Sequence, residues 1–160
     1  MELNTRGRYA VMAMADIAQH VAEHGAERAV SLADIGARQH LPVTYLEQLF
    51  SKLREAELVV SVRGRHGGYQ LGRPADAIAI AEVLRAVEEP TRMTRCLGPD
   101  DPGCVGDQRC ITHGLWSALG QHIYGFLANV TLADVVNDTV ALVGKRQHRD
   151  ASPVGLEVDA

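Results

Sequence analysis

The chain has 160 residues, of which 46% are apolar and 22% are charged, so we expect one folded domain with a packed core rather than extended disorder. Sixteen Lys and Arg face twenty Asp and Glu, and the net charge of -4 argues against a protein that coats nucleic acid by bulk positive charge. Three cysteines, an odd number, exclude a fully paired disulfide framework.

The charge is unevenly distributed. Residues 1–73 contain nine basic and eight acidic side chains, whereas residues 74–160 contain seven basic and twelve acidic ones. The N-terminal segment lacks the apolar core of a secretory signal, and no run approaches 18 apolar residues. We therefore expect a cytoplasmic protein without a membrane span, whose thiols stay reduced.

Three helices are predicted in the first 56 residues. Apolar side chains recur at helical spacing over residues 9–21, and a second, short helix follows to about residue 40. Ser31 and Asp34 fit a capping box at its start, and Pro42 suits the first turn of a third helix over residues 42–56.

A β-hairpin follows these helices. Residues 58–62 and 69–71 favour extended strands, and the basic, glycine-rich segment 63–68 joins them. Further helices are predicted over residues 78–88, 113–129 and 132–136, the last capped by Thr131. Residues 91–109 have the Gly and Pro content of a loop, and the polar tail 144–160 is expected to be disordered.

Three helices followed by a hairpin indicate a winged helix-turn-helix, in a mainly α-helical chain with a small β wing. We divide the chain into a DNA-binding domain over residues 1–75, a segment 76–143 with the cysteine loop and further helices, and the tail. The helix over residues 42–56 would enter the major groove, and the hairpin tip would approach a minor groove. The candidate DNA-binding residues are Arg6, Arg8, Thr44, Tyr45, Glu47, Gln48, Lys52, Arg63, Gly64 and Arg65.

The cysteines form a candidate metal site with a histidine. Cys96, Cys104, Cys110 and His113 follow the pattern C-x7-C-x5-C-x2-H within a Gly- and Pro-rich stretch. Three thiolates and one imidazole are a normal ligand set for structural zinc, and iron–sulfur clusters mostly take four cysteines. Ligand identity alone therefore favours zinc, although the wide gaps between the cysteines weaken that preference.

Several motifs resemble the iron–sulfur cluster regulators within a wider family of winged-helix repressors, over about residues 1–148. The matching stretches are residues 5–11 (TRGRYAV), 45–50 (YLEQLF), 61–64 (SVRG), 67–69 (GGY), 110–113 (CITH), 125–127 (GFL), 130–132 (VTL) and 144–148 (GKRQH). The first four stretches suit the wider family, and the cysteine motif and the tail motif are narrower signals.

The resemblance implies a homodimer that regulates genes for iron–sulfur cluster biogenesis, as repressor or activator. It implies a [2Fe–2S] cluster held by the three cysteines and His113, supplied by the assembly machinery, and so reverses the preference for zinc. It also implies that Glu47, Gln48 and Arg63 read DNA, with Glu47 discriminating two operator classes. The long helix 113–129 would form much of the dimer interface through Trp116, Leu119, Ile123 and Phe126.

Two departures from the family pattern stand out. Seven residues separate Cys96 from Cys104 where five are usual, and two extra loop residues cost little closure entropy. Arg65 and His66 replace the usual Pro-Gly of the wing. The alternatives are a repressor of the same family with a zinc staple, or one that senses nitric oxide or redox state. We expect no enzyme, because the sequence shows no nucleophile–base set or phosphate loop.

Overall fold

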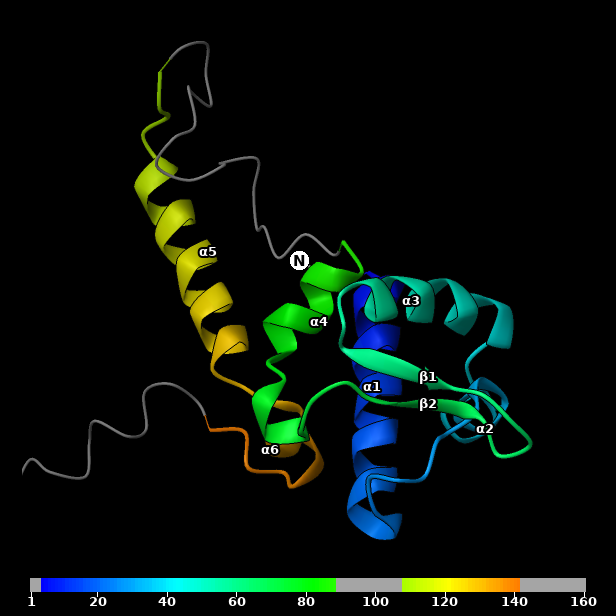
Figure 1. Cartoon of the computed structure of the whole chain (residues 1–160). Coiled ribbons are helices and arrows are strands. Elements are labelled where there is room, and N and C mark those ends of the chain that lie inside the picture. Colours follow the sequence, from blue (N-terminus) through cyan, green and yellow to red (C-terminus); the bar gives the residue numbers. More distant parts are fainter. Residues whose placement is uncertain (1–3, 89–107, 142–160) are drawn as a thin grey trace, which may run out of the picture.

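In the described part of the chain, three α-helices are followed by a β-hairpin, a 3-10 helix and three further α-helices (Figure 1). The computed structural model describes residues 4–88 and 108–141. Its elements are α1 (Thr5–His24), α2 (Leu32–Gln39), α3 (Val43–Glu55), β1 (Val59–Val62), β2 (Gly68–Leu71), the 3-10 helix η1 (Ala75–Ala77), α4 (Ile80–Ala86), α5 (His113–Ala128) and α6 (Leu132–Val136).

Helix α1 is longer at both ends than the apolar stripe predicts. Asn4 is the N-cap, and its side chain accepts a hydrogen bond from the Arg6 N–H at 2.7 Å. At the other end Gly25, with φ of 91°, donates its N–H to the Val21 carbonyl. These caps extend the helix beyond its buried positions, because they satisfy backbone groups that the ends of a helix leave unpaired.

The predicted cap of α2 is confirmed, with one difference in its hydrogen bonds. The Asp34 N–H donates to the Ser31 hydroxyl at 3.1 Å, as a capping box requires. The Asp34 carboxylate, however, accepts from the Ser31 hydroxyl at 2.7 Å rather than from a backbone N–H.

The two strands form an antiparallel hairpin in the register Val59 opposite Leu71 and Val62 opposite Gly68. Val30, between α1 and α2, forms an isolated antiparallel bridge with Tyr69 of β2. This bridge attaches the hairpin to the helix-turn-helix.

Helix α4 is shorter than the predicted 78–88 segment. Ile78 has extended dihedrals, and its carbonyl accepts the N–H of Leu132 at 3.0 Å. The Ile80 N–H in turn donates to the Val130 carbonyl at 2.9 Å. This pairing with a segment fifty residues away holds the chain extended before α4, and no local sequence signal reveals it.

The core lies around α1. Buried Met14 and Ile17 of α1 share one apolar cluster with Phe50 of α3 and Leu58. The same cluster includes residues from the second half of the chain: Ile78, Ile80, Val83, Leu84, Val87, Val130 and Leu132. Helices α4 and α6 thus belong to the core that supports the winged helix, and the boundary after residue 75 stays a prediction.

Helix α5 lies at the margin of the molecule, and its N-terminal half extends away from the body formed by α1, α3 and α4 (Figure 1). Its C-terminal half is anchored, since Phe126 and Leu127 pack against the core cluster. Leu115, Trp116 and Tyr124 are exposed large apolar side chains on this helix. Within the described residues, no helix is long and apolar enough to span a membrane.

Candidate nucleic-acid interface and cysteine–histidine pair

Helix α3 has one apolar face and one polar face. Leu46, Leu49, Phe50 and Leu53 are buried. Thr44, Glu47 and Gln48, which we predict to contact bases, are all exposed on the remaining surface. Amide and carboxylate groups on an exposed helix face can pair with base edges in a major groove, so the helix presents the required chemistry.

Tyr45 differs from these neighbours, because it is half-buried rather than exposed. Its ring meets the ring of Tyr9 edge to face, with centroids 5.9 Å apart. This contact joins the start of α3 to α1, so the ring of Tyr45 contributes to packing as well as lying beside the predicted DNA-binding face.

A buried carboxylate fixes α2 against α1. The Asp16 side chain is 3% exposed and accepts hydrogen bonds from Arg38 Nε at 3.1 Å and Nη2 at 2.6 Å. The Gln39 side chain donates a third bond at 2.7 Å. The bond to Asp16 stabilises the charged guanidinium and raises the pKa of Arg38. This clamp sets the angle between the first two helices of the winged helix.

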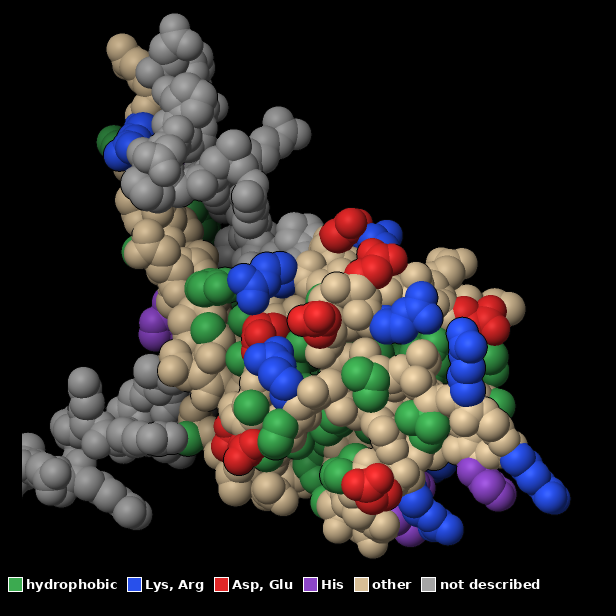
Figure 2. Space-filling model, in the orientation of Figure 1, with side chains coloured by type: hydrophobic (Ala, Val, Ile, Leu, Met, Phe, Trp, Pro, Cys, Tyr) green, Lys and Arg blue, Asp and Glu red, His purple; other side chains and the backbone are tan. Residues whose placement is uncertain are grey.

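The hairpin tip projects as a basic loop. Arg63, Gly64 and Arg65 are exposed, and Arg63 and Arg65 form no ion pair within residues 4–88 and 108–141. Figure 2 shows basic side chains at the edge of the molecule where Figure 1 places this tip. Free guanidinium groups on a projecting turn suit contacts with phosphates or with a narrow minor groove.

Two glycines give the hairpin its shape. A Cβ on Gly67 would lie 2.5 Å from the Val62 carbonyl oxygen, so the turn closes only without a side chain there. A Cβ on Gly68 would lie 2.3 Å from the Val30 carbonyl oxygen, where the chain before α2 crosses β2. The Gly-Gly pair therefore fixes both the tip and its attachment to the body.

Three other predicted contacts, Arg6, Arg8 and Lys52, lie near the start of α1 and on α3. Arg8 is exposed. Lys52 Nζ lies 2.5 Å from Glu88 Oε2, and Arg6 Nη1 lies 4.0 Å from the same oxygen. The hydrogen bond from Lys52 is the main cause of the lowered pKa of Glu88. Two of these three predicted DNA-binding residues are thus paired with a carboxylate of the same chain.

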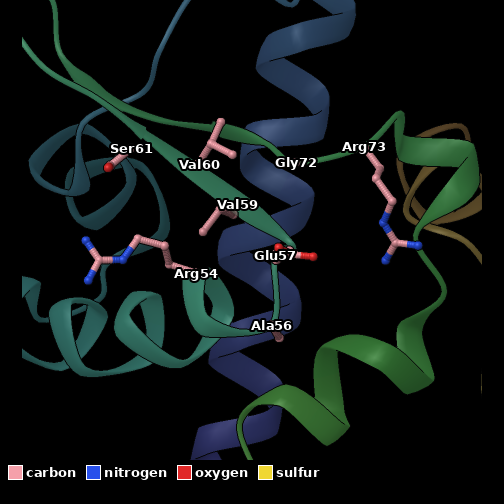
Figure 3. A pocket seen from close by; sticks show the side chains of 8 residues that line it. All are labelled: Arg54, Ala56, Glu57, Val59, Val60, Ser61, Gly72 and Arg73. Atoms are coloured by element: carbon pink, nitrogen blue, oxygen red, sulfur yellow. The ribbon is translucent and has the colours of Figure 1, made fainter.

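An open groove runs beside β1 and the end of α3, between Arg54 and Arg73 (Figure 3). Val59, Val60 and Ser61 form one wall, and no predicted DNA-binding residue lines the groove. It is therefore separate from the candidate DNA-binding surface.

Half of the predicted metal ligands lie in the described part of the chain. Cys110 and His113 are brought together at the N-terminus of α5, where the His113 N–H donates to the Cys110 carbonyl at 3.0 Å. Cys110 Sγ and Thr112 Oγ1 are 3.5 Å apart, and His113 is 7% exposed. Cys96 and Cys104 lie outside the described residues, so the four-ligand set stays a prediction. A thiol and an imidazole one helical turn apart fit a zinc or an iron–sulfur site.

The ion pairs of Glu88 and of the buried Asp16 were not predicted from the sequence. Each carboxylate meets its partners across more than twenty residues of chain. For Asp16 the sequence offered one clue, its place on the apolar face of the first helix. A carboxylate buried there needs a partner, because an unpaired buried charge is costly.

Comparisons with known proteins give one consistent result. The family model described as Rrf2, iron-dependent transcriptional regulator, matches residues 3–138. The "HTH-type transcriptional regulator IscR" of Serratia proteamaculans is 50% identical over 151 residues, which cover 94% of this chain and 88% of that protein.

Solved structures are similar over the same length. One titled "T. potens IscR" is 34% identical, with a TM-score of 0.69, and covers 92% of this chain and 97% of its own. The structure of CymR, titled the global cysteine regulator of B. subtilis, is 33% identical, with a TM-score of 0.70, and covers 86% and 98%.

Proposed function

Because the chain belongs to the Rrf2 family of transcriptional regulators, we propose that it senses an iron–sulfur cluster and regulates cluster-biogenesis genes as a DNA-binding homodimer. Membership confirms two expectations from the sequence, a winged-helix fold and a DNA-binding regulator rather than an enzyme. The cluster, the dimer and the individual contacts are the proposal.

The pair formed by Cys110 and His113 is the observation on which the sensing function rests. His113 begins α5 and Cys110 lies just before it, and the other end of this helix packs into the core that supports the winged helix. In the proposal Cys96 and Cys104 complete the site as a [2Fe–2S] centre, loaded by the cytoplasmic assembly machinery. The bound cluster would supply one-electron chemistry and sensitivity to iron supply.

Operator binding is assigned to the α3 face and the hairpin tip. Thr44, Glu47 and Gln48 would lie in the major groove, where Glu47 accepts a hydrogen bond from a cytosine amino group. Arg63 would enter the flanking minor groove, and Gly64 lets the backbone approach it closely. In a dimer, two such units would meet half-sites about 34 Å apart, which is one turn of DNA.

Arg63→Ala tests the DNA assignment. The probe is a duplex selected from a random library by the wild-type protein, and the measurement is its affinity at several salt concentrations. We expect a loss of about 1–3 kcal/mol for a base-edge contact, or a salt slope smaller by about 1 for a phosphate contact. Arg28→Ala, at an exposed arginine before α2, is the control. Unchanged affinity and slope in Arg63→Ala would show that the wing does not contact DNA.

A further inference from the structure

Charged groups from three helices converge at one point of the predicted DNA-binding surface. Glu88, directly after α4, accepts from Lys52 of α3 at 2.5 Å and lies 4.0 Å from the guanidinium of Arg6 in α1. We name these three residues the Glu88 cluster. It links two predicted DNA-binding residues to one carboxylate.

Fold stability does not account for this cluster. The Glu88 side chain is 71% exposed and that of Arg6 is 44% exposed, and ion pairs at such exposure contribute little to stability. Glu88 also has a φ of 57°, a left-handed conformation that favours glycine or asparagine after a helix. An acidic side chain at this position therefore calls for another explanation.

We propose that Glu88 is an internal competitor of DNA phosphate for Lys52 and Arg6, which weakens binding to DNA of any sequence. The inference rests on the proposed function, in that it takes the start of α1 and the last turn of α3 to face the DNA backbone. A carboxylate and a phosphate oxygen accept the same charged hydrogen bonds, so one cation must leave Glu88 to bind DNA fully.

Counterion release makes this competition measurable through the salt dependence of the DNA affinity. A free lysine or arginine that reaches a phosphate releases a condensed cation from the DNA. When Lys52 leaves Glu88, the exposed carboxylate either stays beside the phosphates and repels them or takes up a cation from solution. Either event reduces the free energy that counterion release contributes to binding. Base contacts from Glu47 and Gln48 do not depend on this exchange, so Glu88 would lower the affinity for every sequence and leave discrimination between sequences to the base contacts.

Glu88→Gln removes the charge and retains the size of the side chain. We expect affinity for a random-sequence duplex to rise several-fold near 0.1 M salt, with a salt slope steeper by about 0.9 for each additional phosphate that the protein neutralises. The affinity for the selected duplex should rise by the same factor. Glu57→Gln is the matched control, because Glu57 also follows a helix, is exposed and has a φ of 58°.

A second background separates competition from a general change in charge. In the Arg6→Met/Lys52→Met variant, adding Glu88→Gln should change affinity no more than Glu57→Gln does. A gain that persists in this background overturns the proposal, as does a Glu88→Gln protein that matches wild type in slope and affinity. Failure of the proposed function would look different, since the wild type would then select no duplex or would tolerate Arg63→Ala.

Discussion

At the scale of single residues, Asp16 is the buried charge on which the arrangement of α1 and α2 depends. Its side chain is 3% exposed, whereas that of its partner Arg38 is 44% exposed. The two members of the pair are therefore unequal: loss of the guanidinium leaves a buried carboxylate short of partners, but loss of the carboxylate leaves a guanidinium that water can reach.

This asymmetry gives a stability prediction. Arg38→Met should lower the free energy of unfolding by about 3 kcal/mol, because it leaves a buried charge with only the Gln39 donor. Asp16→Asn, which retains an acceptor oxygen, should cost about 1–2 kcal/mol. Urea denaturation of both variants measures the difference. An equal cost, or a larger cost for Asp16→Asn, would contradict the account.

The sequence revealed residues such as Thr44 and Arg63 because each is defined locally, by a helix face or a turn. It did not reveal the partners of Asp16 and Glu88. Those pairings depend on the angles at which α1, α2, α3 and α4 pack. These angles cannot be derived from a single sequence.

At the scale of elements, the start of α4 depends on Glu82. Its carboxylate accepts from the Ala79 N–H at 3.0 Å and from Arg73 at 2.9 Å. The backbone hydrogen bond from Ala79, and then the one from Arg73, lower the pKa of Glu82 below its ordinary value of 4.5. These bonds hold the N-terminus of the helix and attach it to the segment after β2.

A lowered carboxyl pKa gives a defined pH dependence. The unfolded chain binds a proton more readily than the fold, so the contribution is complete above pH 4.5 and is lost as the pH falls through the folded pKa. Glu82→Ala should cost about 1 kcal/mol at pH 7, like the loss of a helix cap, and progressively less below pH 4.5. Asp76→Ala is the control, and urea midpoints from pH 3 to 7 measure both. A constant difference across this range would contradict the account.

Helices and strands were predictable where the spacing of apolar residues agrees with the capping and turn residues at the ends. The hairpin and α6 match their predictions, since β-branched runs, glycines and the Thr131 cap mark them. Helices α1 and α4 differ in length, because their ends are set by the Asn4 cap and by the pairing of Ile78 with Leu132 rather than by an apolar stripe.

At the scale of the whole molecule, α5 is the element that suits the predicted dimer contact. Trp116 is 37% exposed and Leu115 is 61% exposed, on the half of the helix that extends from the body. Leu115 was not among the predicted interface residues. Of those that were, Leu119 and Ile123 are half-buried, and Phe126 packs against the core of its own chain.

Trp116→Glu tests the dimer. A charge at the centre of an apolar interface should yield a monomer in sedimentation velocity and weaken binding to a duplex with two half-sites, because the two units then bind separately. Gln121→Glu, at an exposed polar position of the same helix, is the control for added charge. If Trp116→Glu sediments as the wild type does, the dimer contact lies elsewhere.

The net charge of -4 acquires a meaning at this scale. The acidic excess belongs to residues 74–160, while the hairpin tip and the exposed face of α3 belong to the slightly basic first half. One acidic residue from the second segment, Glu88, pairs with Lys52 of the predicted DNA-binding surface. Selective, salt-sensitive binding suits this distribution better than general coating of nucleic acid.

Metal analysis of the anaerobically purified protein is the sharpest test of the proposed iron–sulfur sensing. A cluster-binding protein should be coloured and contain iron and acid-labile sulfide in equal amounts, and Cys104→Ala should lose both. A colourless protein that holds stoichiometric zinc, or iron and a visible spectrum unchanged in Cys104→Ala, would contradict this proposal.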